Sequence, residues 1–170
     1  EKILAYDDFA EDAVGDFPGK WTTNASGDIM TVDNFPGKWL NISKQGFYIP
    51  QFITSLPDNF TIEYDLLFLP PSNAEGPNTA VAGFQVINAP GGKANFDYGP
   101  DRGYFELDPY MNNVNIASYT KNGEKILSNE FKAAGVDRTK LFNYHIAIWR
   151  QQGRLRVYLN ETKLVDAPSL

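Results

Sequence analysis

Apolar and polar positions alternate with a period of two near the end of the chain. Residues 144–150 alternate, Gly153 interrupts the pattern, and residues 154–159 alternate again before Asn160 and residues 164–165. Successive side chains of a strand point to opposite faces, so this pattern predicts strands with one apolar face. Gly153 predicts a hairpin with a short loop, and Asn160 a second tight turn, because Asn tolerates left-handed geometry. We expect three short antiparallel strands here.

Short runs of the same kind recur along the rest of the chain, separated by turn residues. The segments with strand-like composition are residues 3–9, 40–42, 46–50, 59–68, 79–86, 103–107 and 115–119. Residues 129–135 form the only predicted helical turn. About 10–12 short strands with minimal helix predict an all-β fold, an antiparallel β-sandwich of the jelly-roll type.

Composition supports this fold and narrows the function. Aromatic residues make up 14% of 170 residues, and 14 Gly and 11 Pro are spread along the chain, as many strands with frequent turns would require. We expect a single domain over residues 1–170, which ends like a piece of a longer chain. No apolar stretch approaches the ~20 residues of a membrane helix, so no transmembrane segment is predicted.

Charge and cysteine content exclude several functions. The net charge is −6 with few, dispersed basic residues, which argues against nucleic-acid binding. The chain has no cysteine, so disulfides and thiolate metal sites are excluded.

A pentapeptide, Phe-Pro-Gly-Lys-Trp, occurs twice, at residues 17–21 and 35–39. Pro followed by Gly is typical of a type II turn, which would place each Trp at the start of a strand. Two interpretations follow. Trp21 and Trp39 are exposed aromatic platforms, or two similar corners each pack a Trp into the core.

The order of the strands resembles that of a known superfamily. Residues 60–65, followed much later by residues 145–150 and the hairpin 154–160, resemble the concanavalin A-like, laminin-G-like jelly rolls. The opening segment, residues 8–21, looks like the β-sandwich domain that precedes an outer-membrane protein A-like domain in envelope proteins of Bacteroidetes. The resemblance implies a periplasmic, outer-membrane-associated or extracellular location. It also implies a polysaccharide or an envelope protein as partner.

Two acids raise the question of catalysis. Retaining glucanases on the resembled fold carry Glu-x-Asp-x-x-Glu on one strand, with the catalytic carboxyls about 5 Å apart. Glu63 and Asp65 match the first two acids, but the third would fall at Leu67 or Phe68. We therefore predict no catalytic residue. Glu63 and Asp65 then belong to a broken catalytic strand or make polar contacts to a sugar. The alternative is that they lie on the solvated face of a half-buried strand, with Ile62 and its alternating neighbours facing inwards.

Face parity predicts a glycan-binding strip. Trp149 and His145 share one face of their strand, and Arg156 and Tyr158 point away from the apolar positions of the next strand. If these residues share a face with Glu63, Asp65 and Gln85, they combine aromatic and polar groups as sugar sites do. The planar guanidinium group of Arg156 would suit an acidic sugar. His145 is the only histidine, and a packed or surface role is its alternative. Trp149 also has an alternative, a filling role in the core, because Trp is highly buried on average.

Calcium is the one cofactor that the sequence suggests. Asn95, Asp97 and Asp101 bring three oxygen ligands together around a predicted turn. Ordinary turn-forming Asn and Asp are the alternative. Taken together, these patterns predict a non-catalytic envelope module that binds glycan or protein partners. A degenerate glycoside hydrolase and a structural spacer are the other two hypotheses.

Overall fold

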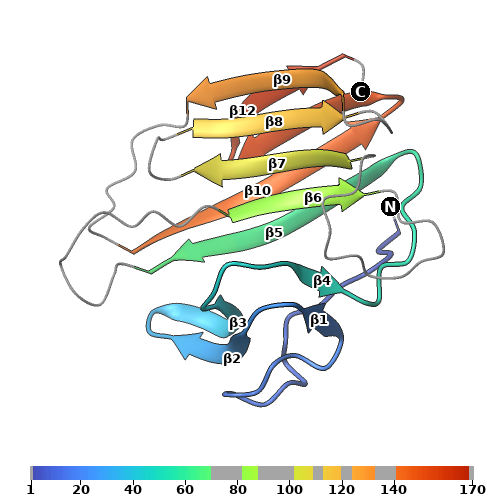
Figure 1. Ribbon diagram of the computed structural model, residues 1–170. Coiled ribbons are helices and arrows are strands. Elements are labelled where there is room, and N and C mark those ends of the chain that lie inside the picture. Colours follow the sequence, from blue (N-terminus) through green and yellow to red (C-terminus); the bar gives the residue numbers. More distant parts are fainter. Residues whose placement is uncertain are drawn as a thin grey trace. The chain divides into compact units, whose positions relative to one another are not determined.

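A computed structural model describes residues 2–69, 82–87, 102–108, 113–119, 124–132 and 141–168. These residues form twelve strands and no helix, so no helix among them could span a membrane (Figure 1). All strand pairs are antiparallel. The described residues fall into two compact units, residues 2–55 and the described segments from Leu56 onwards, and each unit is described below by itself. The prediction of a single domain over residues 1–170 stays a prediction.

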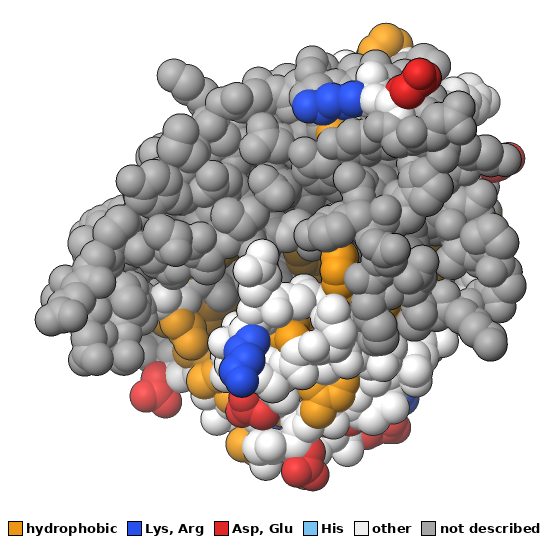
Figure 2. Space-filling model, in the orientation of Figure 1, with side chains coloured by type: hydrophobic (Ala, Val, Ile, Leu, Met, Phe, Trp, Pro, Cys, Tyr) orange, Lys and Arg blue, Asp and Glu red, His pale blue; other side chains and the backbone are white. Residues whose placement is uncertain are grey.

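The first unit, described over residues 2–55, holds two small sheets. Its four strands are β1 (Trp21–Thr23), β2 (Gly27–Val32), β3 (Phe35–Ile42) and β4 (Tyr48–Pro50). β1 pairs with β4, and β2 pairs with β3. Its fully buried side chains are Ile29 and Pro18. In Figure 2 the described surface around these strands carries acidic and hydrophobic side chains interspersed.

The second unit, which begins at Leu56, holds two four-stranded sheets in the orders β12-β11-β10-β5 and β6-β7-β8-β9. Their strands are β5 (Phe60–Phe68), β6 (Ala82–Ile87), β7 (Arg102–Asp108), β8 (Asn113–Tyr119), β9 (Lys125–Lys132), β10 (Phe142–Gln151), β11 (Arg154–Leu159) and β12 (Thr162–Ala167). The fold is the predicted all-β antiparallel β-sandwich.

One face of the β12-β11-β10-β5 sheet forms the hydrophobic core. Ile146 and Val157 are fully buried, and Ile148 is 5% exposed. Ile62, Tyr64 and other half-buried side chains pack against this cluster, as the alternation along the strands predicted. The remaining buried members are Phe68, Tyr144, Leu159, Val165 and Ala167. Because every second side chain points away from this core, the opposite face of the same sheet is left for polar residues.

The two turns predicted between the last three strands, β10, β11 and β12, are confirmed. Gln152 (φ 50°) and Gly153 (φ 78°) both have positive φ between β10 and β11, the pair of values that a type I′ hairpin turn requires. Asn160 (φ 53°) is left-handed between β11 and β12. Its amide N donates to the carbonyl O of His145, and its side-chain oxygen accepts from the amide N of His145. The turn is therefore tied to the neighbouring strand β10.

Three local predictions were wrong. Residues 3–9 form no strand, and residues 129–132 of the predicted helical turn lie in β9. The two copies of the pentapeptide also differ in structure. The first copy forms a turn and Trp21 begins β1, as predicted. Trp21 N donates to Pro18 O, however, so Pro is the first residue of the turn and not the second, as a type II turn would have it. The second copy lies inside β3, where Gly37 has a positive φ of 87°. The positive φ of Gly37 was predicted, but the register shifts between the pairs Val32↔Phe35 and Met30↔Trp39. Pro36 and Gly37 therefore lie in an irregularity of β3 and not in a turn that leads into a strand.

Candidate functional site

The outward-facing side chains of β5, β10, β11 and β12 form the candidate site, which we call the outer face. Strand register arranges them in rows across the sheet. One row runs Thr61–Trp149–Arg156–Asp166, and the next runs Glu63–Ala147–Tyr158–Lys163. A third row pairs Asp65 with His145. The face thus holds aromatic, cationic and acidic groups on a sheet whose other side is the core.

The acidic end of the outer face lies on β5. Asp65 Oδ1 and His145 Nδ1 are 3.0 Å apart, and both side chains are about half exposed. Glu63 is exposed one row further along. Burial alternates along β5, so these two acids lie on one face of the strand and Ile62 and Tyr64 lie on the other. This is the arrangement predicted for a solvated face. Phe68, one of the two positions where a third catalytic acid would fall, is buried in the core.

Trp149 is half-buried on this face and one of its ring faces is occupied. The guanidinium carbon of Arg156, its partner on β11, lies 4.6 Å from the centroid of the Trp149 ring. This distance is typical of a cation–π contact. The indole is therefore neither a core residue nor a bare aromatic platform. It supports Arg156 and holds the guanidinium group against the sheet.

A bulge in β12 gathers cations around one carboxylate. Val157 pairs with Val165 but Tyr158 pairs with Lys163, so Leu164 is the extra residue and packs against the core. Without this bulge, strict alternation would put Lys163 and Asp166 on opposite faces. With it, Lys163 Nζ lies 3.0 Å from Asp166 Oδ2.

Two arginines complete this group, which we call the Asp166 cluster. Arg154 Nε donates to Asp166 Oδ1 at 2.5 Å, and Arg156 Nε lies 3.6 Å from the same oxygen. The hydrogen bonds from Arg154 and then Lys163 hold the pKa of Asp166 well below its usual range. The hydrogen bond between Arg154 and Asp166 also raises the pKa of Arg154. Beside the cluster, Trp149, Gln151, Arg154 and Arg156 line a shallow depression.

The structure brings six of the seven predicted ligand-binding residues onto one face. These are Trp149, His145, Arg156, Tyr158, Glu63 and Asp65. Gln85 is the exception, because β6 belongs to the other four-stranded sheet. The predicted calcium ligands Asn95, Asp97 and Asp101 lie outside the described residues. Within the described segments, no group of acidic or His side chains is arranged to hold a metal ion.

The sequence patterns missed Lys163 and Asp166. Simple alternation along β12 separates them, and only the bulge unites them. One signal was available, because Leu164 and Val165 are adjacent apolar residues in an otherwise alternating strand. Two adjacent residues that both contact the core indicate an extra residue in the strand.

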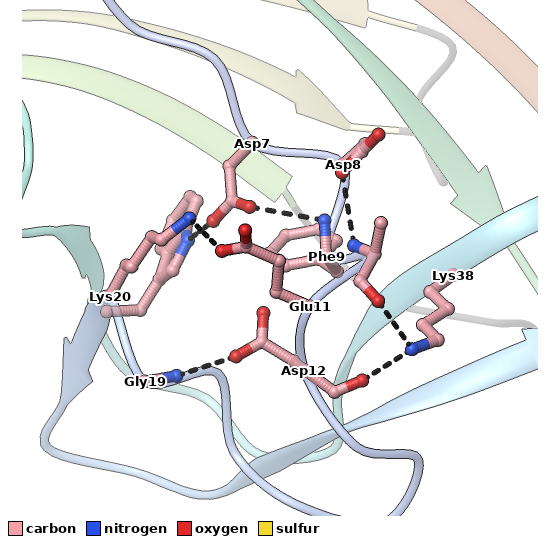
Figure 3. Close-up of polar contacts among 10 residues, drawn as sticks. Asp7, Asp8, Phe9, Glu11, Asp12, Gly19, Lys20 and Lys38 are labelled. Carbon is pink, nitrogen blue, oxygen red and sulfur yellow. Dashed lines mark hydrogen bonds and ion pairs between the residues drawn. The ribbon is translucent and has the colours of Figure 1, made fainter.

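A second cluster of charges lies in the first unit, in the loop of residues 7–12 (Figure 3). Asp7 accepts from Phe9 N and, at 2.9 Å, from Trp21 Nε1, while Asp12 Oδ1 accepts from Gly19 N. Lys38 Nζ donates to the carbonyl oxygens of Ala10 and Asp12. These groups already form hydrogen bonds with other groups of the same chain, so the loop has a structural role.

The lysines of both pentapeptide copies reach this loop. Lys38 binds its carbonyl oxygens, and Lys20 Nζ lies 2.9 Å from Glu11 Oε2. The two tryptophans pack on aromatic neighbours, Trp21 on Phe9 and Phe52 and Trp39 on Phe35. Both are half-buried, which supports the packing interpretation over exposed platforms.

Comparisons with known proteins show the fold. No family model matches the sequence, and no curated protein matches it. A carbohydrate-binding module, CBM66 from Bacillus subtilis, has a similar solved structure, with a TM-score of 0.54. The two are 19% identical, and the match covers 89% of this chain and 81% of that chain. At this identity the likeness supports the β-sandwich fold, and the function has to be argued from the outer face.

Proposed function

We propose that this protein is a non-catalytic carbohydrate-binding module that binds glycan on the outer face. The observation that carries the proposal is the convergence of Trp149, Tyr158, His145 and Arg156 on one face of a sheet whose other side is a packed core. Glycan sites combine aromatic surface with a few fixed polar groups. A rigid sheet keeps these groups in place, which lowers the entropy that binding costs. The carbohydrate-binding module of similar fold supports the same class of function.

The arrangement of acids favours binding over hydrolysis. A retaining glycosidase needs two carboxyl groups that act as a pair, one as nucleophile and one as acid/base. Here Asp65 is engaged by His145, and the core side chain of Phe68 occupies one of the two positions for the third acid. Glu63 and Asp65 are better suited to accept hydrogen bonds from sugar hydroxyls. We also propose that the protein acts at the cell envelope or outside the cell, with a polysaccharide as its partner.

Trp149→Ala tests the proposal. The change removes the ring that supports Arg156, so we expect at least tenfold weaker retention in affinity gel electrophoresis against a panel of neutral and acidic polysaccharides. Because Trp149 is half-buried outside the core, the free energy of unfolding should fall by only about 1–2 kcal/mol, near the range of exposed cation–π contacts with some packing added.

Tyr6→Ala is the matched control. Tyr6 is an exposed aromatic residue of the first unit, so its removal should leave retention unchanged. The proposal fails if the wild-type protein is retained by no polysaccharide, or if Trp149→Ala and Tyr6→Ala reduce retention equally. Turnover of a β-glucan that is abolished by Glu63→Gln would instead identify an enzyme.

A further inference from the structure

Charge is unevenly distributed over the outer face. The acids Glu63 and Asp65 lie on β5, at one edge of the sheet, while Arg154, Arg156 and Lys163 lie on β11 and β12. These three cations share one carboxylate, that of Asp166. The β11–β12 end of the face therefore carries a local excess of positive charge in a protein of net charge −6.

We propose that the Asp166 cluster binds the carboxylate of an acidic sugar, so that the preferred ligand of the outer face is a uronic-acid-containing polysaccharide. This inference rests on the proposed function and specifies its ligand. The separation of acids and cations on the outer face would also orient the bound polysaccharide. The sugar carboxylate lies over β11 and β12, and the neutral hydroxyl groups of neighbouring sugars face the acids of β5.

The two arginines are held in place before any ligand arrives. Arg154 is fixed through its Nε by Asp166, and Arg156 is stacked on Trp149. Each guanidinium group is thus held through its Nε or its face. Among the described residues, no hydrogen bond occupies the terminal nitrogens of either arginine. Such nitrogens bind a carboxylate through two parallel hydrogen bonds.

Exposure and neighbouring groups suit a sugar. The side chains of Arg154 and Lys163 are about half exposed, and that of Arg156 is a quarter exposed. Arg154, Arg156, Trp149 and Gln151 line the shallow depression. The amide of Gln151 offers a donor and an acceptor to hydroxyl groups. Groups that can bind a carboxylate and groups that can bind hydroxyls therefore line the same depression, as recognition of a uronic acid requires.

Esterification provides the decisive test. We would measure binding of the whole 170-residue chain to polygalacturonate, alginate and hyaluronate, each as the free acid and as its methyl ester. The ester keeps the sugar but removes the charge. At least one free acid should bind, and its ester should bind at least tenfold more weakly. Arg154→Gln and Arg156→Gln should each weaken binding of that acid at least tenfold.

Lys44→Gln controls for net charge. Lys44 is an exposed residue of the first unit, and its substitution changes the charge by the same amount, so binding should stay within twofold of wild type. Melting temperatures of all three variants report whether they are folded. Dextran sulfate serves as a polyanion without carboxylates.

The outcomes separate this inference from the proposed function. Equal binding of acid and ester, retention by neutral polysaccharides only, or equal binding of dextran sulfate would overturn the uronate site and leave a glycan module intact. An equal loss of binding in Lys44→Gln would also overturn it, because net charge would then explain the effect. Retention by no polysaccharide at all would refute both proposals.

Discussion

The acidic loop of the first unit and the outer face of the second unit use charged residues in different ways. In the loop of residues 7–12, carboxylates and carbonyl oxygens accept hydrogen bonds from backbone amides, Trp21 and Lys38. On the outer face, the ionic groups bond to one another across the strands and remain partly exposed. The first pattern stabilises a loop without a large apolar core. The second is possible because the core behind β10 and β11 already stabilises the sheet.

The largest effect should come from the core of the second unit. Ile146→Ala leaves a cavity at a fully buried position and should lower the free energy of unfolding by about 2–5 kcal/mol, as measured by chemical denaturation. Ile42→Ala, at a position that is 53% exposed in the first unit, should cost less than about 0.5 kcal/mol. Similar losses for both would mean that the sheet does not depend on this core.

An intermediate effect should come from the acidic loop. Lys38→Met removes an ammonium group that donates to the carbonyl oxygens of Ala10 and Asp12, and should cost about 1.5–3 kcal/mol. Lys20→Met is a matched control at the equivalent pentapeptide position. It loses only an exposed ion pair with Glu11 and should leave the free energy of unfolding nearly unchanged. Equal costs would contradict the structural role given to Lys38.

The smallest effect concerns the Asp166 cluster and pH. The pKa of Asp166 is depressed in the folded state, so the unfolded state binds the proton first as pH falls. The resulting stabilisation is present above the unfolded pKa of about 3.9 and is lost as pH falls below it towards the folded pKa. Urea denaturation at several pH values should therefore give a smaller decrease in stability below about pH 4 for Asp166→Asn than for wild type.

The result of the pH experiment has a clear alternative. Parallel stability curves for wild type and Asp166→Asn would show that the carboxylate has the same proton affinity in both states. In that case Arg154 and Lys163 would be free to move, and the preorganisation of the Asp166 cluster would be lost.

Local patterns in the sequence determined much of the second unit. Alternation separated the inward positions Ile146, Ile148 and Val157 from the outward positions Trp149 and Arg156, because the side-chain period of a strand is a local property. Gly153 and Asn160 marked their turns because few residues adopt positive φ at low cost. Residues 3–9 have the composition of a strand but form none, since a strand also needs a pairing partner.

Only the tertiary structure decided which residues meet. It placed β5 next to β10, which brings Asp65 to His145, and it put Gln85 in the other sheet. It also introduced the bulge at Leu164 that joins Lys163 to Asp166. The physical reason is that strand order and register depend on contacts between distant segments and on the packing of a shared core. Alternation within one strand carries no information about its neighbour.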